Sequence, residues 1–255
     1  MTKLIMCVLV VCGLIFNSQA EKKPSKEVKA LIVTGGCCHD YKNQKSIVGD
    51  GLKERLNFSY EVLFEMKAEK MKEALSKPDW HKPYDLIIYN FCHAHETDQK
   101  FIESVAKVHY DGKPAIALHC TFHTYHWKIK PDANGKKAWT QFVGVTSPNH
   151  GPKSKIKVTP EDKEHPIMKD FPAEWTTPNG ELYNIKEVHE NTKILAMGTR
   201  TENGDKTPNP CIWVNTYGKG KLFGTTLGHH NETMQEKVYL DMLSRAVLWT
   251  TGNLK

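Results

Sequence analysis

"KALIVTGGCCHDY", residues 29 to 41, begins with a short apolar run and ends in a cluster of glycine, cysteine, histidine and aspartate. A continuous apolar run of this length is typical of a strand that is buried on both faces of a sheet. Similar runs return further along the chain, in "YEVLFEM" (60–66), "YDLIIYNF" (84–91) and "KPAIALH" (113–119). The sequence therefore predicts a series of buried strands.

Segments with helical spacing and charged faces separate these runs, at about 44–57, 68–76 and 97–110. Strands that alternate with helices predict an α/β fold with a mostly parallel sheet covered by helices. Because such crossovers are right-handed, the loops that follow the strands should all lie along one edge of the sheet.

The middle of the chain has a different character. Pro, Gly, Asn, Lys and Asp interrupt residues 129–180, except for a weak strand pattern at "SKIKVTP" (154–160), which predicts a long irregular excursion that shapes a pocket. Strand patterns then resume in "TKILAMG" (192–198), "CIWVNTYG" (211–218) and "GKLFGTTLG" (220–228). We expect a hairpin-like turn at Lys219 and Gly220 and a closing helix over 232–250.

The N-terminus has the order of a secretory signal peptide. Lys3 precedes the apolar run 4–16, and the small residues Ser18 and Ala20 follow it, which predicts cleavage after Ala20. Residues 21–255 should form a single domain, exported to the periplasm or the outside of the cell. No later segment approaches the about 20 consecutive apolar residues of a membrane span.

Charge and cysteine content narrow the possible partners and class. The net charge of +6 is spread along the chain without a basic stripe, so we expect no nucleic-acid partner. After cleavage five cysteines remain, an odd number whose spacing does not match a small disulfide scaffold. The adjacent Cys37 and Cys38 could form a vicinal disulfide or remain thiols.

Unusual residues gather where the predicted strands end. They occur in "GGCCHDY" (35–41), "FCHAHE" (91–96), "ALHCTFHTYHW" (117–127) and "LGHHNE" (227–232), which hold eight of the 13 histidines. Ligands of open parallel sheets bind beyond the carboxyl ends of the strands. We therefore predict a functional pocket at this edge.

His119 is the strongest single candidate, because it stands at a strand-to-helix turn, where α/β folds present a nucleophile or base. Cys120 is its rival, although a small buried residue at the junction is the simpler interpretation. "GELYNI" (180–185) places Glu181 and Tyr183 where an acid and a phenol could reach the same edge. Four further histidines are interpreted as exposed polar loop residues: His93, His95, His123 and His126.

"ALIVTGGCCHDY", "IALHC", "GELYNI" and "YGKGKLFGTTLGHH" together resemble the ThuA-like (trehalose utilisation) family of the class I glutamine amidotransferase-like superfamily, over about residues 28–250. The resemblance implies a flavodoxin-like three-layer sandwich and a role in sugar metabolism, including keto-sugar derivatives of glucosides. It implies motif residues at His39, His119, Glu181, Tyr183 and His229. The glycines that flank the amidotransferase nucleophile are replaced by Ala117 and Thr121, so we do not expect glutamine hydrolysis.

The leading hypothesis is an exported hydrolase, lyase or isomerase that acts on a small carbohydrate. His119 and His39 would act as acid or base and Glu181 would orient them or share the proton. The substrate would be bound by a second set of residues: Tyr183, His229, Cys120 and Gly36.

Three other hypotheses stay open beside it. His39, His119 and His229 could instead hold a divalent metal such as zinc, with His93 or His95 as further ligands. Another alternative is a non-catalytic carbohydrate-binding module on the same fold. A thiol-redox role for Cys37 and Cys38 ranks last, because redox cysteines are usually separated by two residues. The oligomeric state is left open.

Overall fold

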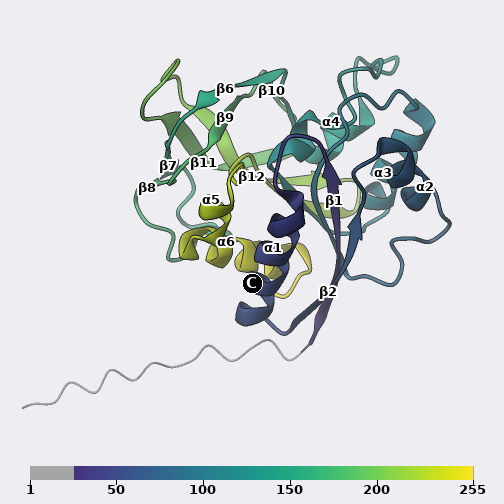
Figure 1. The fold of residues 1–255 in the computed structure, drawn as a ribbon, viewed down its shortest axis with the longest axis horizontal. Coiled ribbons are helices and arrows are strands. Elements are labelled where there is room, and N and C mark those ends of the chain that lie inside the picture. Colours follow the sequence, from purple (N-terminus) through teal and green to yellow (C-terminus); the bar gives the residue numbers. More distant parts are fainter. Residues whose placement is uncertain (1–25, 255) are drawn as a thin grey trace, which may run out of the picture.

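The computed structural model describes residues 26–254, and the predicted signal peptide lies outside this range. Its central sheet contains β1 (Val28–Gly36), β2 (Phe58–Phe64), β3 (Leu86–Cys92), β4 (Ala115–Leu118), β7 (Ile156–Pro160), β8 (Trp175–Thr176), β11 (Thr192–Arg200), β12 (Asn209–Tyr217) and β13 (Gly220–Thr225). Across the sheet these strands follow the order β2-β1-β3-β4-β13-β12-β11-β7-β8 (Figure 1).

The sheet has a parallel half and an antiparallel half. The strands β2, β1, β3, β4 and β13 pair in parallel, which confirms the prediction for the first four apolar runs. The strands β12, β11, β7 and β8 pair antiparallel, so the sheet as a whole is mixed. The change of direction occurs between β12 and β13, since the tight turn that joins them can link only antiparallel neighbours. This turn lies at Gly218 and Lys219, one residue earlier than predicted, and Gly220 already pairs with Tyr217.

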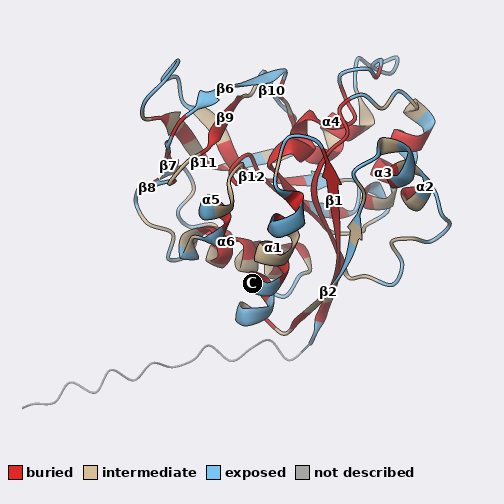
Figure 2. Ribbon diagram, viewed as in Figure 1, coloured by how far each residue is buried: buried red, intermediate tan, exposed pale blue. Residues whose placement is uncertain are grey.

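Helices pack on both faces of the sheet. Successive residues of a strand point to opposite faces, and in β1 Ile32 packs in a core cluster with α1 (Tyr41–Arg55) and α6 (Lys237–Thr250), whereas Val33 packs in a second cluster with α2 (Ala68–Leu75) and α3 (Gln99–Tyr110). The buried residues follow the strands, and the exposed ones lie on the outer helix surfaces and loops (Figure 2). The continuous apolar runs are therefore explained by burial from two sides.

The predicted closing helix is divided in two. A short helix, α5 (Asn231–Gln235), comes before α6, and Glu236 between them has extended backbone with φ −59° and ψ 135°. The carbonyl of Glu236 accepts a hydrogen bond from the Leu240 N–H at 3.1 Å, so this residue starts α6. Helices α1, α5 and α6 lie together on one side of the molecule (Figure 1).

The excursion over residues 129–180 is more regular than predicted. It contains α4 (Ala138–Val143), β5 (Val145–Thr146), β6 (Asn149–Lys153), β7, the 3-10 helix η2 (Pro166–Met168) and β8. It is followed by β9 (Glu181–Asn184) and β10 (Glu187–Val188). Each of these strands pairs with a strand of the excursion to make a small two-stranded sheet, β9 with β6 and β10 with β5. The weak pattern "SKIKVTP" forms the strand β7, in which the alternating side chains of Ile156 and Val158 are buried.

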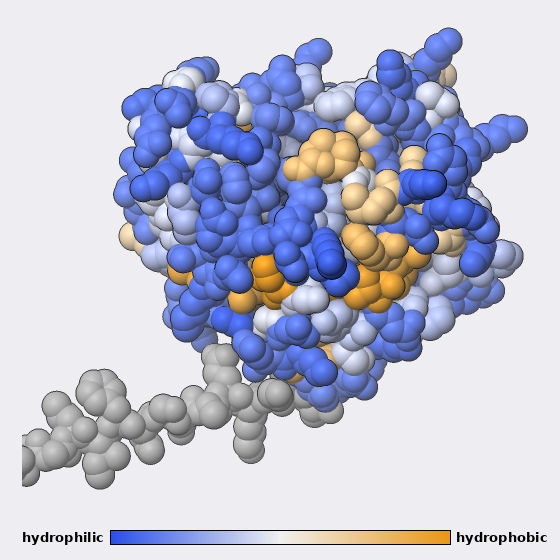
Figure 3. Space-filling model, viewed as in Figure 1, coloured by the Kyte–Doolittle hydropathy of each residue, from blue (hydrophilic) through white to orange (hydrophobic). Residues whose placement is uncertain are grey.

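Within residues 26–254, no helix is both long and apolar enough to cross a membrane. The face of the molecule seen in Figure 3 is mostly hydrophilic, with apolar residues gathered in patches near its middle. Among the residues that the structure describes, six large apolar side chains remain exposed, and two of them, Met66 and Trp127, line the pocket described below.

Candidate functional site

The site is centred on the turn that follows β4. The 3-10 helix η1 (His119–His123) begins directly after Leu118, and His119 has a φ of +42°, a left-handed value that is uncommon for a residue with a side chain. Its Nδ1 lies 2.6 Å from the carbonyl oxygen of Thr226, just beyond β13. Because a carbonyl can only accept, Nδ1 carries the proton, and Nε2 of the neutral ring keeps a free lone pair. The neighbouring strand thus fixes both the orientation and the tautomer of His119.

Two further imidazoles meet His119. His39 follows β1 and His229 follows β13, and the ring centroids are 4.8 Å apart for His39 and His119, 4.6 Å for His39 and His229, and 5.2 Å for His119 and His229. One ring nitrogen from each residue lies within 4.8 Å of the others. We call these three residues the imidazole cluster. The structure therefore brings together side chains from the ends of three separate strands, at the sheet edge that the sequence indicated.

Glu181, the first residue of β9, faces the imidazole cluster. Its Oε1 lies 3.1 Å from His229 Nε2, and its Oε2 lies 3.7 Å from His119 Nε2 and 3.6 Å from His150 Nε2. Burial raises the pKa of Glu181, but the neighbouring imidazoles of His119 and His229 outweigh this effect and hold the pKa well below its ordinary value. The carboxylate is therefore ionised at neutral pH.

Two histidines of the cluster, His39 and His119, are held neutral. Burial, followed by repulsion from His119 and His229, lowers the pKa of His39 to about 2. Burial likewise lowers the pKa of His119. His39 Nδ1 and His119 Nε2 are buried without a hydrogen-bond partner among the described residues. Neutral imidazoles with unused lone pairs are the form in which histidine binds a metal ion.

This donor set fits a divalent ion such as zinc. Catalytic zinc sites use three protein ligands, often histidines, and keep a further position open. His39, His119 and His229 supply three imidazoles, and the unpartnered buried nitrogens are accounted for if an ion binds there. The Thr226 carbonyl would hold His119 in place, and the Glu181 carboxylate would hold His229. Metal-binding histidines usually have such a partner on their second ring nitrogen.

A cavity of about 970 Å³ opens beside the cluster. All but one of the predicted site residues line it, namely Gly36, His39, Cys120, Glu181, Tyr183 and His229. His119 lies behind this wall, with 1% of its surface exposed. Gly36 has a φ of +93°, and a Cβ there would lie 2.0 Å from the Cys92 carbonyl oxygen, so glycine lets the loop after β1 approach β3.

With this geometry in view, the comparisons with known proteins identify the family. The family model described as "ThuA: Trehalose utilisation" matches residues 29–250. The chain belongs to the ThuA family. The resemblance seen in the sequence motifs is thereby confirmed, whereas no curated protein matches this chain.

Solved structures share the fold of this ThuA-family chain. A ThuA-like protein from Parabacteroides merdae superposes with a TM-score of 0.73 at 18% identity, covering 90% of this chain and 92% of its own. A ThuA-like protein from Bacteroides uniformis gives 0.66 at 16% identity, with 92% and 95% covered. A beta-galactosidase from Rahnella sp. R3 gives 0.55 at 13% identity, with 85% of this chain but 30% of that chain covered. At these identities the likeness shows the fold alone.

The interpretation of four histidines as exposed loop residues was wrong for three of them. His93, His123 and His126 are buried, whereas His95 is exposed as predicted. The His123 ring stacks on Tyr183 with centroids 4.0 Å apart, and its Nε2 lies 3.1 Å from Ser147 Oγ. Burial lowers the pKa of His123 to about 3 and that of His126 to about 4. Ser147 of the excursion and Tyr183 just after it thus cover His123.

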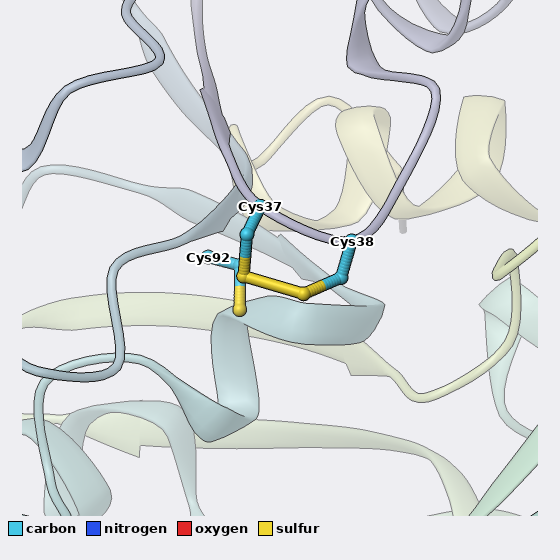
Figure 4. Close-up of side chains that lie close together, drawn as sticks. All are labelled: Cys37, Cys38 and Cys92. Atoms are coloured by element: carbon cyan, nitrogen blue, oxygen red, sulfur yellow. A yellow bond between two sulfur atoms is a disulfide. The ribbon is translucent and has the colours of Figure 1, made fainter.

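The open question about Cys37 and Cys38 is answered by a disulfide between them (Figure 4). Cys120 is buried at the junction of β4 and η1, as expected, and its thiol donates a hydrogen bond to Cys92 Sγ at 2.6 Å. This hydrogen bond lowers the pKa of Cys92 and raises that of Cys120. The sulfur atoms of Cys37, Cys38 and Cys92 lie within 4.8 Å of one another.

Sequence reasoning missed several residues of this ThuA-family site. His150 and Lys153 of β6 line the cavity beside Glu181, and Trp127 lies at its exposed rim. His150 stands in "SPNHGP" (147–152), a stretch without strand periodicity, so no signal marked it. Thr226 was also missed, because a backbone carbonyl leaves no mark in the sequence.

Proposed function

We propose that this ThuA-family chain is a carbohydrate-active enzyme whose reaction centre is Glu181 with the imidazole cluster. One observation carries this proposal: three imidazoles and an ionised carboxylate converge at the wall of a cavity of about 970 Å³, large enough for a sugar. Clusters of histidine and carboxylate with shifted pKa values in a cleft are typical of functional sites.

The lining of the cavity supports a carbohydrate ligand. Trp127 and Met66 are 43% and 53% exposed and offer apolar surface to the C–H face of a sugar ring. Glu69, Lys72 and His150 supply polar groups for its hydroxyls. The family description, trehalose utilisation, points to the same class of ligand.

A keto-sugar or a glucoside derivative is the proposed substrate. Removal of a proton next to a carbonyl needs a base at the substrate and an electrophile that stabilises the developing negative charge. Glu181 lines the cavity, is ionised and can accept this proton. We assign His39 to ligand binding instead, because one of its ring nitrogens lies with those of His119 and His229 in the imidazole cluster.

In this proposal His39, His119 and His229 hold a divalent ion. When bound, such an ion supplies Lewis-acid polarisation of an oxygen of the substrate. The chain's own part is to keep His39 and His119 neutral by burial, to set the tautomer of His119 through Thr226, and to place Glu181 against His229.

Two further expectations complete the proposal. Export to the periplasm or the outside of the cell is supported by the charge, apolar run and small residues of residues 1–20. A flavodoxin-like three-layer sandwich is supported by the helices on both faces of the sheet.

Elemental analysis of the untagged chain tests the metal first. We expect about one divalent ion per chain, as in other catalytic zinc sites. It should be lost in His119→Ala and kept in His95→Ala, which removes an exposed histidine at the rim of the same cavity. An equal metal content in both variants would contradict the assignment of the imidazole cluster.

Turnover of keto-glucosides tests the chemistry. We expect product with the wild type, and binding without product with Glu181→Gln, because the amide cannot accept the proton. Binding without product in the wild type would make the chain a carbohydrate-binding module. If calorimetry detects no keto-glucoside binding at millimolar concentrations, the proposed substrate class is wrong.

A further inference from the structure

Four sulfur atoms meet beside the cavity. Cys37 and Cys38 form an exposed disulfide in the loop after β1, Cys92 ends β3, and Cys120 follows β4. Figure 4 shows the side chain of Cys92 beside the Cys37–Cys38 disulfide. We call these four residues the sulfur cluster. Cys211, the remaining cysteine of residues 26–254, is buried in β12, and its thiol donates a hydrogen bond to the Ala196 carbonyl of β11.

The sulfur cluster has the parts that thiol–disulfide exchange needs. Exchange requires a thiol beside a disulfide and a second thiol that resolves the mixed disulfide. Cys92 Sγ lies within 4.8 Å of both disulfide sulfurs, and Cys120 Sγ lies 2.6 Å from Cys92 Sγ. The backbone N–H of Cys37 donates to the Cys92 carbonyl at 3.4 Å, which holds the two loops side by side.

Access differs between the two pairs. Cys37 and Cys38 are exposed, and exposed disulfides are the labile ones in proteins. Cys92 and Cys120 are buried, although both line the cavity. One pair therefore faces solvent, where it can meet small thiols and disulfides, and the other lies within the site.

We propose that the sulfur cluster is a thiol–disulfide exchange site, in which one disulfide moves between the exposed Cys37–Cys38 pair and the buried Cys92–Cys120 pair. This exchange does not depend on the sugar chemistry proposed above.

The steps balance within the chain. Cys92 gives up its proton and its thiolate attacks one sulfur of the Cys37–Cys38 disulfide, which breaks that S–S bond and leaves the other sulfur to take a proton. Cys120 then gives up its proton and attacks Cys92 Sγ, which breaks the mixed disulfide and releases the second surface sulfur as a thiol. One disulfide exists before and after, two protons are exchanged, and no electrons enter or leave.

The exchange has a structural consequence near the imidazole cluster. A Cys92–Cys120 bond would join the end of β3 covalently to the residue that follows His119. With a Cys37–Cys38 bond, β3 and η1 have no covalent link here and are joined by hydrogen bonds, from Cys120 Sγ to Cys92 Sγ and from Thr121 Oγ1 to the Tyr89 carbonyl. The position of the disulfide within the sulfur cluster thus sets how firmly the His119 turn is held.

Maleimide trapping tests the proposal. The full mature chain is quenched in acid, labelled with N-ethylmaleimide, digested and mapped by mass spectrometry. We expect two disulfide isomers in the wild type, one labelled at Cys92 and Cys120 and the other labelled at Cys37 and Cys38. In both, Cys211 should be labelled once the chain is unfolded.

Single variants separate exchange from a purely structural disulfide. In Cys92→Ser the labelling of Cys37 and Cys38 should be lost, and in Cys120→Ser a mixed disulfide to Cys92 should accumulate because no thiol resolves it. Cys211→Ser should give the wild-type isomer pattern. A Cys37–Cys38 disulfide as the single isomer in the wild type, with no mixed disulfide in Cys120→Ser, would overturn the proposal. The wild-type map stands even if a variant does not fold.

Discussion

Replacement of His123 by Gln should flatten the dependence of stability on pH. His123 is buried in the cavity wall, and burial, followed by repulsion from His119 and His126, lowers its pKa from 6.5 to about 3. Between pH 6.5 and about pH 3, His123 is therefore protonated in the unfolded chain and neutral in the folded chain. Stability contributed by the neutral ring is present above pH 6.5 and is lost as the pH falls toward 3.

The size of this effect follows from linkage. Each pH unit in this interval costs about 1.4 kcal/mol per buried histidine, so His123 should remove about 2 kcal/mol of unfolding free energy between pH 7 and pH 5. That loss is a large share of the roughly 5–15 kcal/mol that stabilises a typical domain. His123→Gln can still donate to Ser147 Oγ but cannot titrate, and it loses the stacking on Tyr183. We expect it to be about 1 kcal/mol less stable than the wild type at pH 7, and the wild type to lose this advantage by pH 5.

Urea unfolding followed by circular dichroism from pH 5 to pH 7.5 measures this difference. A chelator in all samples removes any contribution from bound metal. His95→Gln, which replaces an exposed histidine of the same cavity, controls for the loss of one imidazole and should follow the wild type. If the stability of His123→Gln runs parallel to that of the wild type over this range, the reasoning from burial is refuted.

Three other substitutions test the site, the first of them with a matched control. Gly36→Ala should lower the free energy of urea unfolding by about 3 kcal/mol, because the left-handed backbone and the contact with the Cys92 carbonyl both oppose a Cβ. The control Gly135→Ala, with φ +76° and open space around it, should cost about 1 kcal/mol, and equal costs would contradict this account. Trp127→Ala should raise the calorimetric Kd for a keto-glucoside about tenfold, or about 1.4 kcal/mol, with an unchanged Tm. Glu181→Gln should lower kcat about 100-fold or more in a product assay, with Kd changed less than about threefold, and retained kcat would remove Glu181 from the reaction.

The parallel half of the fold and the position of the site could be predicted from the sequence. Strands buried on two faces are apolar throughout, so β1, β3 and β4 stand out in the sequence. Parallel strands end at one edge, which is why His39, His119 and His229 could be expected to meet. The motifs that resembled the ThuA family led to the family that the comparison then confirmed.

The two small sheets, β6 with β9 and β5 with β10, could not be predicted to the same degree. Strands such as β6 and β9 have five and four residues, and they form because distant segments pair with them. Burial of polar side chains has the same origin, since His123 is covered by Ser147 and Tyr183 from remote parts of the chain. Sequence patterns report the local period of hydrophobicity, and such contacts leave no local trace.

The site is supported by two separate parts of the structure. The imidazoles stand on the edge of the central sheet, whereas Glu181, Tyr183 and His150 belong to the small β6–β9 sheet outside it. A protein engineer could therefore exchange the β6–β9 ribbon and change the carboxylate and one rim of the cavity while the sheet edge that carries the three histidines keeps its backbone. The architecture thus places the carboxylate and the three imidazoles of the proposed reaction centre on separate elements, and each element can be varied in its own library.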